Sequence, residues 1–124
     1  MITGIGIDMI EVDRVATKIG RESGFRELVF SKKEIEYCEM KAKKFEHYAA
    51  RFAAKEAFLK ALGTGWKNGI AFNEIEITGD DLGKPEMFFL GETAKSIATI
   101  GEIKIFVSLS HLKNIASAAV VIEQ

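Results

Sequence analysis

The segment FAAKEAFLKALGTG, residues 52–65, does most to constrain the fold of this chain, because it predicts a long helix with a defined end. We expect this helix to run from about Glu46 to Leu62. Gly63 and Gly65 then end it, since glycine readily adopts the left-handed backbone conformation that terminates helices.

Two charged residues of this helix lie beside its apolar stripe instead of opposite it. The stripe is formed by Tyr48, Phe52 and Leu59. On a wheel of 3.6 residues per turn, Glu56 and Lys60 fall at its edge. Taken alone, such an i,i+4 pair is a common surface feature worth roughly 0.2–0.5 kcal/mol. The alanines that flank the pair favour instead a position with room for a ligand.

Residues 2–10 alternate between two faces, as in a strand with one packed face. One face carries large apolar side chains, and the other carries Gly4, Gly6 and Asp8. Asp8 therefore lies on a face cleared by glycines. It either caps the end of the strand or serves a ligand, and composition and spacing leave both open.

Asp8 and Glu56 together suit a magnesium ion. The chain has only two histidines and one cysteine, which argues against zinc. Magnesium takes oxygen ligands and keeps several waters for a phosphate-bearing substrate. Lys60 would then neutralise charge on a transferred phosphoryl group. These three residues are the candidate catalytic residues.

The order of the other elements predicts an α+β fold. A first helix follows the strand, and it carries a cationic row of Arg14, Lys18 and Arg21. The pattern SKKE at residues 31–34 predicts a capping box and a helix that ends near residue 41. Strands are expected at IAFNEIEIT and EMFFL, a short helix over about residues 93–100, and two late strands at EIKIFVSLS and ASAAVVIE.

Composition and patterning exclude several classes of protein. The net charge of −1 excludes a globally basic nucleic-acid-binding protein, and no stretch reaches the length of a membrane span. The single cysteine, Cys38, cannot form an internal disulfide and is interpreted as a small core residue. The N-terminal run lacks the cationic start of a signal peptide. We therefore expect a cytoplasmic protein with one domain, residues 1–124.

Two familiar catalytic patterns are not supported. Neither nucleotide-binding glycine motif is complete. Ser110 and His111 are adjacent in a strand and so point to opposite faces, which argues against a serine–histidine dyad. His111 is either a buried, hydrogen-bonded histidine or a substrate contact.

Four segments together resemble the holo-[acyl-carrier-protein] synthase family, the small 4'-phosphopantetheinyl transferases of bacterial fatty-acid synthesis. They are GIGIDMIEVDR (4–14), RFAAKEAFLKALGTG (51–65), GKP (83–85) and SLSH (108–111). The resemblance covers nearly the whole chain and implies the family's fold, a mostly antiparallel sheet packed against a long helix. One departure follows SLSH, where Leu112 and Ile115 occupy a region in which the family more often has polar and aromatic residues.

The resemblance implies transfer of the phosphopantetheine arm from coenzyme A to a serine of apo-acyl carrier protein, with magnesium bound and adenosine 3',5'-bisphosphate released. It implies that Asp8 and Glu56 bind the metal and that Lys60 contacts phosphate. The coenzyme A contacts that it implies are Lys44, Arg51, Lys60, Gly63, Gly65, Lys84, Pro85 and His111.

The resemblance also implies two protein partners. An acidic carrier would dock on Arg14, Lys18 and Arg21. A homotrimer would place each active site at a subunit boundary, so that Lys44 and Arg51 serve a neighbour's coenzyme A.

Two other functions are consistent with the residues. With water as acceptor, the same site would make a magnesium-dependent phosphohydrolase, which yields free phosphopantetheine instead of a modified carrier. A non-catalytic coenzyme A or carrier-binding module would bind its ligand without magnesium-stimulated turnover.

Overall fold

The computed structural model of the chain, which describes residues 1–63 and 69–124, is arranged around the long helix α4 (Lys44–Leu62). The strands are β1 (Ile2–Glu11), β2 (Ile75–Gly79), β3 (Pro85–Phe89), β4 (Lys104–His111) and β5 (Ile115–Glu123). The other helices are α1 (Val12–Arg21), α2 (Phe25–Val29), α3 (Lys32–Glu39), the 3-10 turn η1 (Phe72–Glu74) and α5 (Gly91–Ala98). Among the described residues, no helix combines the length and apolarity that a membrane crossing requires.

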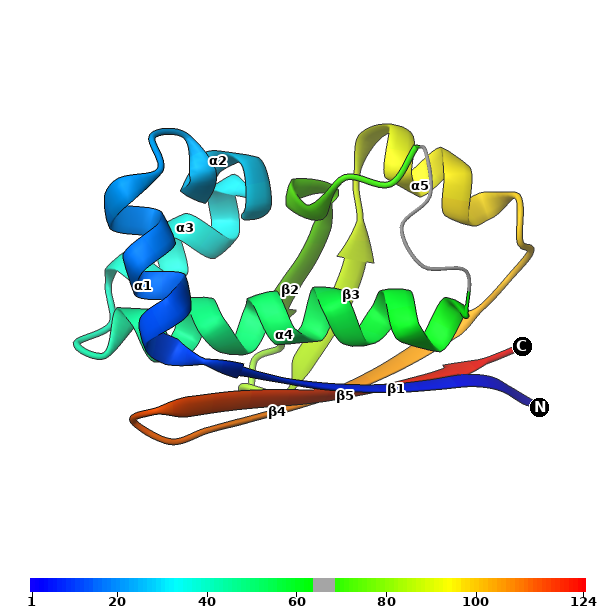
Figure 1. Ribbon diagram of the computed structural model, residues 1–124. Helices are drawn as coiled ribbons and strands as arrows, with labels where there is room; N and C mark the ends of the chain where they lie inside the picture. Colours follow the sequence, from blue (N-terminus) through cyan, green and yellow to red (C-terminus); the bar gives the residue numbers. More distant parts are fainter. Residues whose placement is uncertain (64–68) are drawn as a thin grey trace.

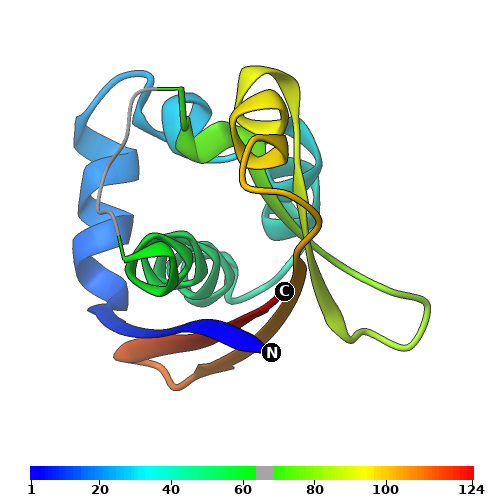
Figure 2. The same ribbon diagram turned by 90° about the vertical axis from the view of Figure 1, so that its right-hand side faces the viewer.

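All strand pairs are antiparallel, as the α+β prediction requires. β1, β5 and β4 form one sheet in the order β1-β5-β4, and β2 and β3 form a separate hairpin. The three-stranded sheet passes beneath α4, while α1, α2 and α3 gather near the N-terminal end of that helix (Figure 1). Figure 2 looks along α4 and shows the sheet on one side of it, with the helices and the β2-β3 hairpin around the rest.

The backbones of α4 and β1 approach each other closely. A Cβ atom at Gly4 would overlap the carbonyl oxygen of Ala61, and one at Gly6 would overlap that of Ala57. Only glycine lets two backbones approach this closely. The packed face of β1 is therefore the glycine face, and the glycines serve helix packing instead of clearing room for a ligand.

The apolar face of β1 points away from α4. Ile5, Ile7 and Met9 are 74%, 66% and 68% exposed in the single chain. Phe106 of β4, on the same sheet, is also exposed. The three-stranded sheet thus has an outer face that no helix of the described chain covers (Figure 1).

Helix α4 is buried on more sides than one apolar stripe predicts. Tyr48, Ala53 and Phe58 are fully buried, and even Lys55 is inaccessible to solvent. The helix packs on Val120 and other small apolar residues of β5. The alanines expected to make room around Glu56 are instead core residues.

The local predictions are mostly confirmed. Ser31 and Glu34 form the expected reciprocal capping box at the start of α3. Gly63 ends α4 with a φ of 74°, in the left-handed region. Cys38 is fully buried, and burial raises the pKa of its thiol to about 12. The short helix α2 was not predicted, because its five residues carry too little periodicity.

Candidate active site

Asp8 and Glu56 line one cavity of about 320 Å³, although they lie far apart in the chain. β1 and α4 run in opposite directions, because Gly4 packs on Ala61 and Gly6 on the preceding turn at Ala57. The next residue on that face of β1 is Asp8, and Glu56 directly precedes Ala57 in α4. We call this hollow the carboxylate cavity; it is lined by Asp8, Met9, Ile10, Arg14, Val15, Lys18, Phe25, Phe52 and Glu56.

Lys60 lies at the edge of the carboxylate cavity and already contacts one of its acids. Lys60 Nζ donates to Asp8 Oδ1 at 2.9 Å and to the carbonyl oxygen of Ile7 at 3.0 Å. The Lys60 side chain is 57% exposed, whereas that of Asp8 is only 18% exposed. The lysine can therefore turn towards a ligand without losing a buried contact.

Glu56 has an unusual electrostatic environment. Burial raises the pKa of its carboxyl above the ordinary range, and the negative charge of Asp8 adds to that shift. Lys60 and Lys18 oppose it. Glu56 is thus an acid that is poorly solvated and faces a second acid, which is how active sites tune carboxylates.

The donor set of the carboxylate cavity suits a hard divalent cation such as magnesium. Burial is the main cause of the raised pKa of Glu56, and a cation between Asp8 and Glu56 would relieve the repulsion from Asp8 that adds to it. Across residues 1–63 and 69–124, no cluster of three or more histidine, cysteine, aspartate or glutamate residues could hold a metal. A metal here would bind two protein carboxylates and leave its other positions to water or phosphate, which is typical of magnesium.

Most of the other predicted contacts lie elsewhere in the chain. Arg51, Pro85 and His111 line a second cavity, of about 450 Å³, together with Gly83 and His47. We call it the arginine cavity. A single chain therefore does not bring these residues together with Asp8 and Glu56.

Arg51 is held firmly in the wall of the arginine cavity. It is buried, its Nε donates to the carbonyl oxygen of Ile77 at 3.2 Å, and its guanidinium lies 4.3 Å from the ring centroid of Tyr37. The guanidinium group is thereby oriented before any ligand arrives. Such a planar donor set is well suited to phosphate.

His111 was interpreted either as a buried, hydrogen-bonded histidine or as a substrate contact. The hydrogen bond is present, but the burial is not. Its Nδ1 lies 2.8 Å from Glu46 Oε1, and its side chain is 31% exposed. Its ring packs edge-on against His47, with centroids 5.0 Å apart. Burial lowers the pKa of His47, and the nearby His111, Arg51 and Lys41 lower it further.

The remaining predicted contacts are more scattered. Lys44 forms an exposed ion pair with Glu39 at 3.3 Å and lines neither cavity. Lys84 and Pro85 lie on a turn in which Asp80 Oδ1 accepts from Lys84 N at 2.9 Å, and both line a small neighbouring hollow. Gly63 caps α4. Gly65 lies outside the described residues.

The cationic row on α1 borders the carboxylate cavity. Arg14 and Lys18 contribute to its wall, and the Lys18 ammonium lies 5.7 Å from the ring centroid of Phe25. Arg21 is exposed in the last turn of α1. A partner that met this row would therefore face the cavity that holds Glu56.

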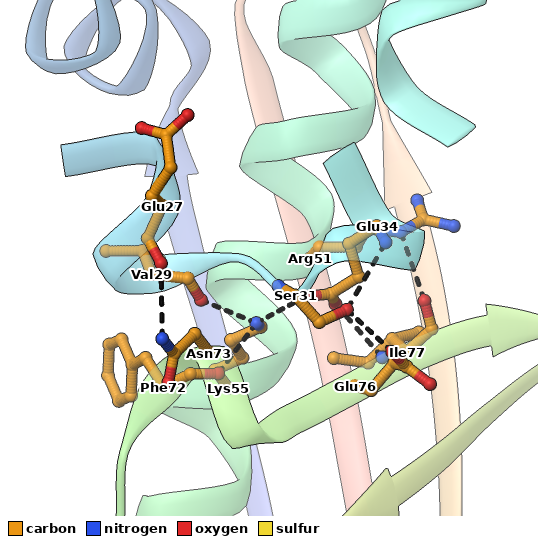
Figure 3. A network of polar contacts seen from close by, with 10 residues as sticks. All are labelled: Glu27, Val29, Ser31, Glu34, Arg51, Lys55, Phe72, Asn73, Glu76 and Ile77. Carbon is orange, nitrogen blue, oxygen red and sulfur yellow. Dashed lines mark hydrogen bonds and ion pairs between the residues drawn. The ribbon is translucent and has the colours of Figure 1, made fainter. Parts of the chain in front are cut away.

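One ionic pair near the site was not predicted at all. Lys55 and Glu34 are both fully buried, with Lys55 Nζ 2.6 Å from Glu34 Oε1 (Figure 3). Lys55 directly precedes Glu56 in α4. The signal in the sequence was a lysine that follows two core alanines, Ala53 and Ala54.

Comparison with known proteins shows the family of the chain. Residues 4–120 match the 4'-phosphopantetheinyl transferase superfamily. A holo-[acyl-carrier-protein] synthase of Cytophaga hutchinsonii is 51% identical, over 97% of this chain and 96% of its own length. One from Geotalea daltonii is 44% identical over the full length of both.

Solved structures give the same result. The holo-[acyl-carrier-protein] synthase of Neisseria meningitidis superposes with a TM-score of 0.89 at 34% identity, over 100% of both chains. The Bacillus anthracis enzyme, in complex with CoA (3',5'-ADP), has a TM-score of 0.82 at 36% identity, over 100% of this chain and 98% of its own.

This chain belongs to the 4'-phosphopantetheinyl transferase superfamily. Within it, the chain groups with the enzymes named holo-[acyl-carrier-protein] synthase, which confirms the resemblance, the enzymatic function and the fold predicted from the sequence.

Proposed function

We propose that this enzyme transfers the 4'-phosphopantetheine arm from coenzyme A to a serine of apo-acyl carrier protein, with magnesium, for fatty-acid synthesis in the cytoplasm. The observation that carries the proposal is the convergence of Asp8 and Glu56 in one cavity, with Lys60 bonded to Asp8. The CoA complex of the Bacillus anthracis enzyme supports coenzyme A as the donor.

Asp8 and Glu56 would hold the magnesium ion, which when bound supplies a Lewis acid for phosphate oxygens. The serine oxygen of the carrier forms a bond to the phosphorus that bears pantetheine. The bond from that phosphorus to the bridging oxygen breaks, and adenosine 3',5'-bisphosphate leaves with the oxygen. Lys60 stabilises the charge that builds up on the phosphoryl oxygens.

Glu56 is our candidate for the group that receives the serine proton, through a water molecule. Its carboxylate lines the same cavity as Asp8, beside the position at which the phosphate is proposed to bind. The proton therefore passes from the serine hydroxyl towards Glu56 as the new oxygen–phosphorus bond forms.

We also propose that three copies of the chain assemble and share their sites. Two observations support assembly: the outer face of the sheet exposes Ile5, Ile7 and Met9, and the arginine cavity is separate from the carboxylate cavity. Covering that face with another copy removes large apolar side chains from water. A site built between copies would place Arg51 and His111 of one chain opposite Glu56 of the next.

The transfer reaction is tested by the intact mass of apo-acyl carrier protein after incubation with the enzyme, coenzyme A and magnesium. We expect the carrier to gain the phosphopantetheine mass, and the gain to disappear when the metal is chelated. Free phosphopantetheine without carrier modification would instead identify a hydrolase, and binding without turnover a non-catalytic module.

The shared site is tested by mixing two inactive variants, Glu56→Gln and Arg51→Met. If each site takes its acid from one chain and its arginine from another, random mixed trimers recover about a quarter of the wild-type rate. Sedimentation of each variant alone verifies that it still assembles. No recovery from variants that do form mixed trimers would mean that each chain uses its own arginine.

A further inference from the structure

The buried network around Lys55 connects the carboxylate cavity with the arginine cavity. Lys55 Nζ donates to Glu34 Oε1 at 2.6 Å, to the carbonyl oxygen of Val29 at 2.7 Å and to that of Phe72 at 2.8 Å. These acceptors belong to α3, to the end of α2 and to η1. One side chain of α4 therefore ties the middle of that helix to three other segments (Figure 3).

The contacts of Lys55 match a charged ammonium group. An ammonium has three donors and no acceptor, and Lys55 faces three oxygen atoms. Burial lowers the pKa of Lys55, whereas the charge and hydrogen bond of Glu34 oppose that shift. A neutral amine would leave one of the three oxygens without a donor.

Glu34 carries the connection onwards to Arg51. Its Oε2 accepts from the backbone N–H of Ile77 at 3.0 Å, and the carbonyl oxygen of the same Ile77 accepts from Arg51 Nε at 3.2 Å. Its Oε1 also accepts from the backbone N–H of Ser31 at 2.9 Å. A single carboxylate thus binds both Lys55 and the residue, Ile77, whose carbonyl oxygen orients Arg51.

A buried ion pair is an expensive way to stabilise a fold. Replacing both members of such a pair with uncharged residues is often neutral or stabilising, whereas removing one member leaves an uncompensated buried charge. Stability alone therefore does not account for a fully buried lysine and glutamate. Their position does, because Lys55 is adjacent to Glu56 and Glu34 is connected to Arg51 through one residue, Ile77.

We propose that Lys55 and Glu34 form a positioning pair, which fixes α4 so that Glu56 enters the carboxylate cavity and Arg51 enters the arginine cavity. Neither residue lines either cavity, so the pair acts through its neighbours. The inference rests on the proposed function, in which these two cavities bind the metal and coenzyme A. Outer residues that orient ligands typically change metal affinity or activity by about 10- to 100-fold when lost.

The test uses two variants of the full chain. Lys55→Met/Glu34→Gln removes both charges. The new amide oxygen can accept from one of the two backbone N–H groups that Glu34 binds, and the amide NH2 can donate towards the oxygens that Lys55 leaves. Glu34→Asp keeps the charge but retracts the carboxylate, so that it cannot reach Lys55 and Ile77 together. Lys95→Met is the matched control, because it breaks an exposed pair with Glu92 in which both side chains are 76% accessible.

Each protein is studied in three experiments. Thermal unfolding gives the melting temperature, electron paramagnetic resonance gives the affinity for Mn²⁺ alone, and steady-state kinetics give kcat and KM for carrier modification. We expect the double variant to have a melting temperature close to that of the wild type. Its affinity for Mn²⁺ and its kcat should each be at least tenfold lower. Glu34→Asp is expected to fold and to lose at least fivefold in both Mn²⁺ affinity and kcat. Lys95→Met should match the wild type in all measurements.

Wild-type Mn²⁺ affinity and kcat in either folded variant would overturn the inference, because the pair would then serve stability only. If the double variant does not fold, Glu34→Asp decides alone. A loss in Lys95→Met equal to that in the buried variants would also overturn it. A wild-type protein that binds Mn²⁺ but modifies no carrier would contradict the proposed function instead, and the Mn²⁺ affinities would still decide the role of the pair.

Discussion

The Lys60 ammonium lies 2.9 Å from Asp8 Oδ1, so a cation of α4 bonds directly to an acid of β1 at the edge of the carboxylate cavity. The same lysine lowers the pKa of the neighbouring Glu56, against the effects of burial and of Asp8. Lys60 is thus placed both to contact a phosphate and to set the charge state of a possible base.

Lys60→Met should therefore reduce carrier modification in two ways. Removal of one preorganised donor to a developing charge costs about 100-fold in rate. Loss of a cation beside Glu56 also raises the pKa of that carboxyl, so that it ionises only at higher pH. If Glu56 is the base, the acid limb of the kcat/KM profile moves to higher pH. Steady-state kinetics over a range of pH measure both effects, with Lys95→Met as the control; a variant with the wild-type rate and profile would contradict both roles.

Glu56→Gln should lower the activity of the enzyme and raise its stability. Folding raises the pKa of the Glu56 carboxyl. Such a group destabilises the folded protein when the pH rises above its pKa in the unfolded state. The destabilisation is complete when the pH also exceeds its pKa in the folded state. Without metal, we expect the glutamine variant to melt above the wild type at pH 7, and the difference to vanish below about pH 4.5. Magnesium should raise the melting temperature of the wild type but not of the variant.

The control for this experiment is Glu92→Gln, which removes an exposed glutamate that lines neither cavity. It should change neither the pH dependence of melting nor the response to magnesium. Equal stabilisation of wild type and Glu56→Gln by magnesium would show that the ion binds elsewhere.

Local features of the fold followed from the sequence because their causes are local. The capping box of Ser31 and Glu34 and the stop at Gly63 depend on residues a few positions apart. The alternation in β1 likewise predicted that Asp8 shares a face with Gly6. These patterns need no knowledge of the partner elements.

The identity of the packed face could not be predicted in the same way. Apolar side chains usually mark the core side of a strand, yet in β1 the core side is marked by glycines, because α4 brings its own alanines and needs close approach. The partner of Lys55 was equally hidden. Glu34 comes from another helix, so no spacing within α4 could reveal the pair. The division of the predicted site into two cavities also depends on tertiary structure.

Gly6→Ala should disrupt the contact that brings Asp8 and Glu56 together. The added Cβ would overlap the Ala57 carbonyl oxygen, a backbone atom that cannot rotate away. Overpacking of this kind typically costs about 1–3 kcal/mol. Chemical denaturation measures the change in the free energy of unfolding.

Gly20→Ala is the matched control for that substitution. Gly20 lies in α1, and a Cβ there would meet no atom within 4 Å. Since alanine favours helix, this variant should be more stable than the wild type by up to about 1 kcal/mol. Equal effects of the two substitutions would mean that close packing of β1 on α4 does not limit stability.

Arg14→Glu should weaken the carrier protein's productive encounter while leaving coenzyme A almost unaffected. Arg14 is exposed on α1 and lines the carboxylate cavity, so an acidic carrier that docks there would bring its serine towards Glu56. Complementary charge mainly accelerates encounter and sets orientation, and both effects weaken as salt screens the charges. We therefore expect KM for the carrier to rise about tenfold at low salt, and the difference from the wild type to shrink at high salt.

Lys33→Glu makes the same charge change on α3, away from the cavity, and should alter KM for the carrier far less. If Arg14→Glu raised the KM values for carrier and coenzyme A equally, α1 would not be the docking surface.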